Sequence, residues 1–287
     1  MLIRQTWKAH PELDLDACAE LFSKAAAEKE LRGDCIASPW HIYAAETLRA
    51  RHQLAVGDSF PADVFVFGQG EPENPAGTKI GGRPYWPADR PWPNGRDGKP
   101  AMFIGQFNFA DSVDIIGDDL PGDVLVLAAD SESDWLYEAD ALTFHWLTDD
   151  GSPPATDLDV ASVTGSTAFY GIIHRTADYP YAFETAMDPD VQYSYLLPVL
   201  SATKIGGLPH FIQCSADTEA LYLCQLTSIQ PAAKVVYPFV NREQPLDLSF
   251  DNGGIYGDQN SLVLADMGTI YLFIDDNGNI SHDFESH

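Results

Sequence analysis

The pentapeptide TKIGG occurs twice in this chain of 287 residues, at 78–82 and at 203–207. After each copy come one variable residue, a proline and two ring-bearing residues, and each copy leads into an apolar run that contains a glutamine. These runs are FIGQFN around Gln106 and YLCQLT around Gln225. A word that recurs together with its downstream context indicates an internal duplication, so the fold must be one that can be built from two related halves.

Short apolar runs separated by Gly, Pro, Asn and Asp dominate the chain after residue 60. They are rich in β-branched and aromatic residues, which favours strands over helices. We therefore expect a domain at 58–287 with pseudo-repeats at about 60–150 and 190–285. The expected strands are 63–68, 101–108, 123–129, 221–226, 261–266 and 269–275.

The N-terminal segment, 1–57, has a different pattern. Over 12–32 apolar residues recur at helical spacing, and Gly33 supplies a C-terminal stop. Ser38 followed by Pro39 is a strong start signal for a second helix that continues to residue 56. We therefore expect an α+β fold class, in which an N-terminal pair of helices precedes, and packs on, a β-rich body of two related halves.

The lysine and glycines of the repeated word allow two interpretations. Glycine lets backbone N–H groups approach an anion closely, and the ammonium group would add positive charge. Neither copy, however, lies in the GxxxxGK[ST] context of a phosphate-binding loop. We favour a structural role, with a bend that no side chain would tolerate and a lysine that covers an acidic neighbourhood. The residues concerned are Lys79, Gly81, Gly82, Lys204, Gly206 and Gly207.

Gln106 and Gln225 each lie in the middle of an expected apolar strand. A buried amide without partners would cost about 1–3 kcal/mol, so both side chains need hydrogen bonds. We expect them to bind loop backbone across the halves, and a ligand-facing amide is the alternative. Trp86 and Trp92 belong to the proline-rich loop RPYWPADRPWPNGR. Packing of that loop is the favoured role for their rings, and a carbohydrate or peptide surface is the alternative.

Motifs for catalysis or metal binding are absent from the sequence. There is no HExxH, no GxSxG and no Cys or His spacing typical of zinc. The segment DDNGN at 275–279 is better explained as a hairpin turn than as a calcium loop, because its glycine comes before the third ligand and no suitably placed glutamate follows. We expect no metal, no cofactor and no enzymatic activity, with an unrecognised enzyme as an alternative.

Charge is distributed very unevenly along the chain, which carries 16 basic and 43 acidic residues for a net charge of −27. Residues 1–99 hold 12 of the basic and 14 of the acidic residues, whereas residues 100–287 hold 4 and 29. Such a field repels nucleic acids and anionic membranes and attracts basic proteins. An acidic surface that serves only solubility is the alternative, although it would be expected to extend over residues 1–99 as well.

Targeting signals are also missing from the sequence. The first 30 residues contain no basic stretch that leads into an apolar run, and no later window approaches 18 uninterrupted apolar residues. The four cysteines show neither CxxC spacing nor the density of a disulfide framework. We therefore expect a cytoplasmic protein with reduced cysteines.

The sequence resembles the YwqG-like proteins, a widespread bacterial family labelled as a domain of unknown function. The resemblance runs in order from about residue 60 to 280. It implies a shared fold, brings no established catalytic residues, and points to a role in toxin systems because relatives of the family occur in polymorphic toxin systems. The matching stretches are KIGG with Pro84, Trp92-Pro93, GKPAMFIGQFNFAD (98–111), LPGDVLVL (120–127), KIGGLPHF (204–211) and GTIYLFID (268–275).

These observations favour an acidic binding or inhibitor protein, most simply a cytoplasmic immunity protein that neutralises a basic toxin such as a secreted nuclease. We expect its contact surface within 111–159, where carboxylates would steer the encounter and aromatic rings would prolong the complex. One alternative is a module that binds a small ligand or peptide in a cleft between the halves, built from the two lysines, the two glutamines and the tryptophan loop; another is an uncharacterised enzyme. The expected contact residues are Asp130, Glu132, Asp134, Trp135, Tyr137, Glu138 and Asp140.

Overall fold

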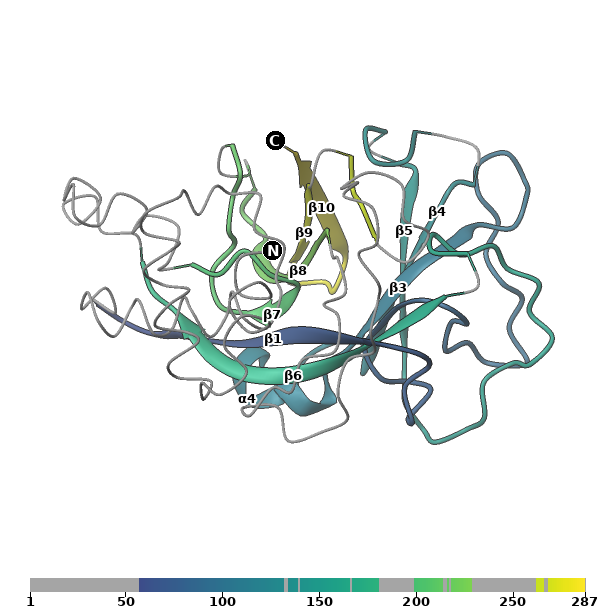
Figure 1. Ribbon diagram of the computed structural model, residues 1–287, viewed down its shortest axis with the longest axis horizontal. Helices are drawn as coiled ribbons and strands as arrows, with labels where there is room; N and C mark the ends of the chain where they lie inside the picture. Colours follow the sequence, from purple (N-terminus) through teal and green to yellow (C-terminus); the bar gives the residue numbers. More distant parts are fainter. Residues whose placement is uncertain are drawn as a thin grey trace, which may run out of the picture.

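The computed structural model describes residues 57–180, 199–228 and 262–286, apart from positions 132, 133, 139, 166, 214, 215, 217, 266 and 267. Nearly all the regular structure in these residues is strand (Figure 1). The helical elements among them are the four-residue α4 (Val113–Ile116) and the 3-10 turn η1 (Ala110–Ser112).

The expected α+β class is wrong for the described chain, which is β-rich. Helical periodicity in the sequence is confined to the expected helices at 12–32 and 39–56, and both lie outside the described residues. After residue 60 the apolar residues alternate or form short runs between turns, a pattern that builds strands.

Ten strands form one sheet in the order β10-β9-β8-β7-β1-β6-β2-β3-β4-β5, and every pairing between them is antiparallel. The first five strands are β1 (Phe60–Gln69), β2 (Lys79–Gly81), β3 (Met102–Asn108), β4 (Val124–Ala129) and β5 (Leu142–Leu147). The second five are β6 (Ala168–Asp178), β7 (Lys204–Gly206), β8 (Leu221–Thr227), β9 (Thr269–Ile274) and β10 (Ile280–Glu285). The order is symmetric about the boundary between β1 and β6, so the sheet consists of two five-strand sets.

The first strand of each set is exchanged between the two sets. β1 pairs with β7 of the second set, and β6 pairs with β2 of the first. β1 and β6 also pair with each other along their whole length, and they are the two long neighbouring ribbons at the bottom of Figure 1. Because each set borrows a strand from the other, the two sets form one continuous sheet.

Five of the expected strands coincide with β1, β3, β4, β8 and β9. The expected strand at 261–266 is wrong, because its described residues, 262–265, belong to no named strand. β5, β6 and β10 were not expected, and the second set begins at Ala168 rather than near 190. The bulges of β3, at Phe103/Gly105, and of β8, at Tyr222/Cys224, precede the two glutamines by the same spacing.

The sheet curls until its two end strands, β5 and β10, approach each other. Trp146 Nε1 donates a hydrogen bond to the carbonyl of Gly278 at 3.2 Å, and the rings of Phe144 and His282 lie 5.5 Å apart. Inside the curl lies the main apolar cluster, which contains Leu125 and other residues from both sets. A second cluster, which includes Trp86 and Phe103, covers the other face of β3 and β4, so every residue of β4 is buried.

Candidate functional site

Each copy of TKIGG forms a tight turn, which we call the first corner (78–83) and the second corner (203–208). All four of their glycines have φ between 64° and 70°, a conformation that other residues rarely adopt. A Cβ atom on Gly207 would lie 2.3 Å from Asp178 Oδ2 and 2.9 Å from Ala62 Cβ. This geometry supports the structural interpretation of the glycine pairs.

The lysine of each corner is buried and paired with a carboxylate. Lys79 Nζ donates to Glu71 Oε2 at 2.8 Å, and Lys204 Nζ donates to Asp178 Oδ2 at 2.6 Å. In the second corner the same carboxylate also accepts the N–H of Leu208 at 3.0 Å. The lysine charges are therefore used inside the protein, where they balance buried or half-buried acids, and they do not face an open anion site.

The two glutamines hold the loops that follow the corners. Gln106 Oε1 accepts the N–H of Tyr85 at 2.8 Å, and its amide donates to the carbonyls of the preceding loop at 2.9 Å. Gln225 Oε1 accepts the N–H of His210 at 3.1 Å, and its Nε2 donates to the carbonyl of Ala202 at 2.8 Å. Each glutamine thus binds backbone within its own half, whereas we expected these bonds to cross between the halves.

The tryptophan loop is packed against the sheet. Trp86 is 1% exposed, and its ring lies 4.8 Å from that of Trp92 in an edge-to-face arrangement. The Trp86 N–H donates to the carbonyl of Arg90 at 3.0 Å, and the Trp92 N–H donates to that of Ala101 at 2.8 Å. The Arg90 guanidinium covers the Trp86 ring at 4.7 Å. These contacts favour the packing role over a ligand-binding surface.

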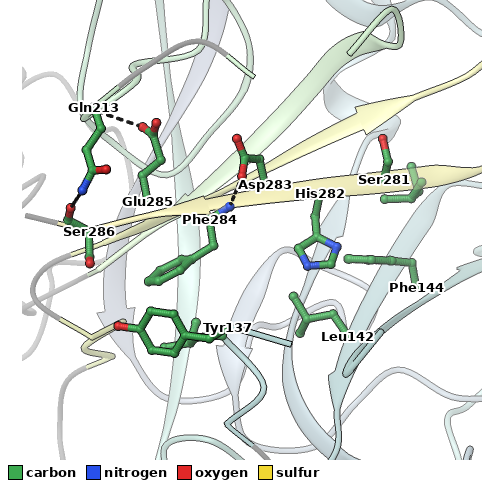
Figure 2. Close-up of a pocket in the computed structure, with 12 residues that line it drawn as sticks. Tyr137, Leu142, Phe144, Gln213, Ser281, His282, Asp283, Phe284, Glu285 and Ser286 are labelled. Carbon is green, nitrogen blue, oxygen red and sulfur yellow. Dashed lines mark hydrogen bonds between the residues drawn. The ribbon is translucent and has the colours of Figure 1, made fainter. Parts of the chain in front are cut away.

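The open space with the clearest functional potential lies between β10 and the segment that precedes and begins β5. This edge pocket has a volume of about 660 Å³, which is within the range of ligand sites. Residues 280–286 line one side, and the other side comes from Leu136, Tyr137, Leu142 and Phe144, with Gln213 at one end (Figure 2). The residues that we singled out in the repeat and in the tryptophan loop do not line it: Gln106, Gln225, Lys79, Lys204, Trp86 and Trp92.

Aromatic side chains meet across the edge pocket. Tyr137 is 63% exposed, and its ring lies 5.5 Å from Phe284 at an interplanar angle of 88°. Figure 2 shows these two rings close together, with Phe144 next to His282. An exposed tyrosine held by a ring contact offers a partner a large contact area at a low cost in conformational entropy.

Among the described residues, the polar groups that line the edge pocket are acidic or neutral, and none of them is a lysine or arginine. Glu285 is buried and accepts the N–H groups of Ile212 and Gln213 at 2.7 and 3.1 Å. Burial lowers the pKa of His282, and the charge of Asp283 opposes this shift without cancelling it. Burial therefore favours the neutral form of the His282 ring.

The exposed tyrosine of the pocket is one of the expected contact residues, and four others lie within three residues of it in the sequence. Asp134 and Tyr137 belong to one turn, because the Tyr137 N–H donates to the Asp134 carbonyl at 2.9 Å. Asp134, Glu138 and Asp140 are all exposed. We call these three carboxylates the acidic rim. Trp135 is half-buried and packs on the main apolar cluster, and Glu132 lies outside the described residues.

Arg96 is a member of this region that the sequence did not predict. It forms ion pairs with Asp130 and Glu138, and its Nη1 lies 3.8 Å from Asp140 Oδ2. Asp130 is buried, and the Arg96 guanidinium lowers its pKa. Asp130 is therefore a buried ion-pair partner of Arg96 and not an exposed charge.

The pocket residues of β10 were also missed, although the sequence contained a signal for them. Ile280, His282 and Phe284 occupy alternate positions after the Asn-Gly turn, which is the pattern of a strand with one face inward. Asp275 accepts the N–H groups of Asn277 and Asn279 at 2.9 and 2.8 Å, so the segment DDNGN forms the β9–β10 hairpin turn, as expected.

The described residues contain neither a metal-binding cluster nor a membrane-spanning helix. Among them, no group of three or more His, Cys, Asp or Glu side chains is arranged to hold a metal ion. None of the helices in this part of the chain has the length and apolar character to cross a membrane.

Comparison with protein families gives one match. Residues 78–287 match the family described as Domain of unknown function (DUF1963). β1 precedes the matched region, although it lies at the centre of the sheet. A comparison with curated proteins finds no match.

Proposed function

The chain belongs to the DUF1963 family, and we propose that it is an acidic inhibitor that binds a basic protein through its edge pocket and acidic rim. In its most specific form, the proposal is that the chain is a YwqG-like immunity protein of the bacterial cytoplasm, and that its partner is a toxin domain with a basic groove, such as a nuclease. The family resemblance and the charge of the chain motivate this form.

One observation carries the proposal. An exposed tyrosine lines a pocket of about 660 Å³ whose described lining contains no lysine or arginine, and the three exposed carboxylates of the acidic rim lie within three residues of this tyrosine in the sequence. Arg96, the arginine found near them among the described residues, pairs with Asp130, Glu138 and Asp140. The local field therefore stays negative and accelerates the encounter with a basic surface, while Tyr137 and the pocket supply the apolar contact that slows dissociation.

The test is a charge-reversal series at the acidic rim. The neighbouring gene is first inspected for a basic toxin domain. That domain is purified and titrated with the wild-type protein and with the triple variant Asp134→Lys, Glu138→Lys, Asp140→Lys. The expected loss is roughly 100-fold in affinity at low salt, mainly in the association rate. Asp118→Lys with Asp119→Lys is the matched control, because both acids are exposed and lie outside the rim.

Two results would reject this proposal. One is a triple variant that binds and neutralises the toxin as well as the wild-type protein does. The other is an equal loss of affinity per charge in the control, which would mean that only the net charge matters.

The edge pocket also favours a second candidate function, the binding of a small ligand or peptide in a cleft between the halves. The pocket lies beside β5 and β10, the last strands of the two sets, and none of the residues from which we expected that cleft to be built lines it. Binding of an uncharged ligand would be lost when Leu142→Trp fills the pocket and would be unaffected by charge reversal at the rim.

A further inference from the structure

The backbone of β10 has one unpaired edge among the described residues. β10 is the last strand of the sheet order and pairs only with β9 there. In an antiparallel pair, alternate residues bond to the partner strand, and the residues between them direct their N–H and C=O groups outward. The bond from Asp275 N–H to the Asn279 carbonyl, at 3.1 Å, sets this alternation. It directs the backbone groups of Ile280, His282 and Phe284 toward the open edge.

The side chain of Asp283 agrees with this assignment. Its Oδ1 accepts the N–H of Phe284 at 2.9 Å, so one outward N–H is capped by a neighbouring carboxylate and not by another strand. Charged side chains on edge strands discourage pairing with further strands. Ile280 and His282 have no such contact with a side-chain acceptor among the described residues.

The two faces of β10 differ in chemistry. Ile280 and Phe284 pack against the main apolar cluster, and His282 lies next to Phe144, so these residues face the inside of the curl. Ser281 and Asp283 alternate with them on the other face. A strand added to this edge would therefore direct every second side chain into the edge pocket and the others toward Asp283.

We propose that the β10 edge receives an extended segment of a basic partner, in which apolar residues alternate with lysine or arginine. The apolar residues enter the edge pocket beside Tyr137, and the basic residues face Asp283 and the acidic rim. Main-chain bonds to Ile280 and His282 supply affinity that does not depend on sequence, and the alternation supplies the specificity. This inference rests on the proposed function, because it takes from it the charge of the partner.

A set of capped six-residue peptides tests the inference directly. One alternates valine with lysine, one alternates valine with glutamate, and one has three valines followed by three lysines. Each peptide is titrated into the full chain, and binding is measured by calorimetry and by the amide signals of Ile280 and His282. We expect the alternating valine–lysine peptide to bind at least about 10-fold more tightly than the other two. Equal binding of the block peptide would overturn the inference, because it would reduce the interaction to charge.

N-methylation of the peptide tests the strand pairing. We expect the peptide to pair antiparallel, as every strand of the sheet does; residues directly opposite each other then share a face and exchange bonds, so the valine amides bond to β10 and the lysine amides point away. Methylation of the valine amides should abolish binding, and methylation of the lysine amides should leave it within about 3-fold of the parent peptide. Equal losses would overturn strand addition. Slow exchange of the Ile280 and His282 amides in the free protein would also overturn it, because other residues of this chain would then occupy the edge.

Failure of this inference can be told apart from failure of the proposed function. If the peptides do not bind while the toxin domain binds in a rim-dependent way, strand addition at β10 is wrong and the inhibitor proposal stands. If the toxin domain binds independently of the rim, the inhibitor proposal is wrong whatever the peptides do, and the inference falls with it.

Discussion

The two corners and the edge pocket use charge in opposite ways. In the corners each lysine is buried against a single carboxylate, so the charges cancel and the backbone is held in one shape. At the pocket the carboxylates outnumber the one arginine, and the acidic rim is exposed. The repeated word therefore builds the sheet, whereas the surface that differs between the halves is the better candidate for recognition.

The corners also differ from each other. The side chain of Glu71 is 47% exposed, whereas those of Asp178 and Lys204 are fully buried. The second corner should therefore be more sensitive to substitution than the first, and neither corner should influence binding at the rim.

The largest expected effect comes from removing the buried carboxylate of the second corner. Asp178→Asn leaves the ammonium of Lys204 without its anion, and we expect a loss of about 3–5 kcal/mol in the free energy of unfolding. Glu71→Gln is the matched substitution in the first corner, where water can reach the partner and where burial has already lowered the pKa of Lys79; its expected loss is about 1 kcal/mol. Urea unfolding measures both, and equal losses would show that the corners do not differ.

A glycine substitution in the second corner should have the next largest effect. Gly207→Ala places a Cβ atom 2.3 Å from Asp178 Oδ2 at a φ of 70°, so backbone strain and a buried clash combine to about 3 kcal/mol. Gly98 has a similar φ of 79° with nothing within 4 Å of an added Cβ. Gly98→Ala, compared by thermal unfolding, should therefore cost only the strain, about 1 kcal/mol. A Gly98→Ala loss as large as that of Gly207→Ala would contradict the close packing of the corner.

Substitution of Tyr137 tests the role of the edge pocket in binding. Tyr137→Ala should weaken binding of the basic partner roughly 30-fold, because an exposed aromatic anchor over a pocket is typical of a binding hot spot. Its effect on the free energy of unfolding should stay within about 0.5 kcal/mol. Leu221→Ala is the control, since Leu221 is a similarly exposed side chain, 69%, on β8. Binding affinity that falls equally in both variants would remove Tyr137 from the contact surface.

The smallest expected effect concerns pH. The pKa of His282 is lower in the folded protein than in the unfolded chain because of burial. The unfolded state therefore takes up the proton first, and the stability that the neutral ring contributes is present above the unfolded pKa, about 6.5, and is lost as pH falls through the lowered folded pKa. His282→Asn should lower the number of protons taken up on unfolding between pH 7 and 5.5 by at most one, so that stability falls less steeply with pH. His145, whose pKa is also lowered by burial, should account for part of the pH dependence of stability that remains in the variant. An unchanged slope in the variant would show that His282 does not titrate with unfolding.

Local patterns in the sequence were enough to find much of the sheet. Alternating or apolar runs located β1, β3, β4, β8 and β9, and the repeated word located the two corners. The strand exchange could not be predicted, because β6 contains Gly171 and Arg175 within a mixed pattern and because pairing between sets depends on contacts distant in sequence. The α+β assignment was wrong because it took its helices from the N-terminal segment alone.

The candidate site was predicted only in part. Acidity and aromatic residues drew attention to the segment from Asp130 to Asp140, and the structure places its exposed members next to a pocket. The sequence could not show that Asp130 is buried against Arg96, a residue from a distant loop. Nor could it bring β10 to the same place, since that requires the closure of the whole sheet.

Amide hydrogen exchange with and without the basic partner separates the role of the corners from that of the open edge. If the corners serve the fold and the open edge serves recognition, the partner should slow exchange at Tyr137, Glu138, Ile280 and His282 and leave the amides of 78–83 and 203–208 unchanged. Slower exchange at the corners, with no change at Tyr137 and along β10, would contradict this division.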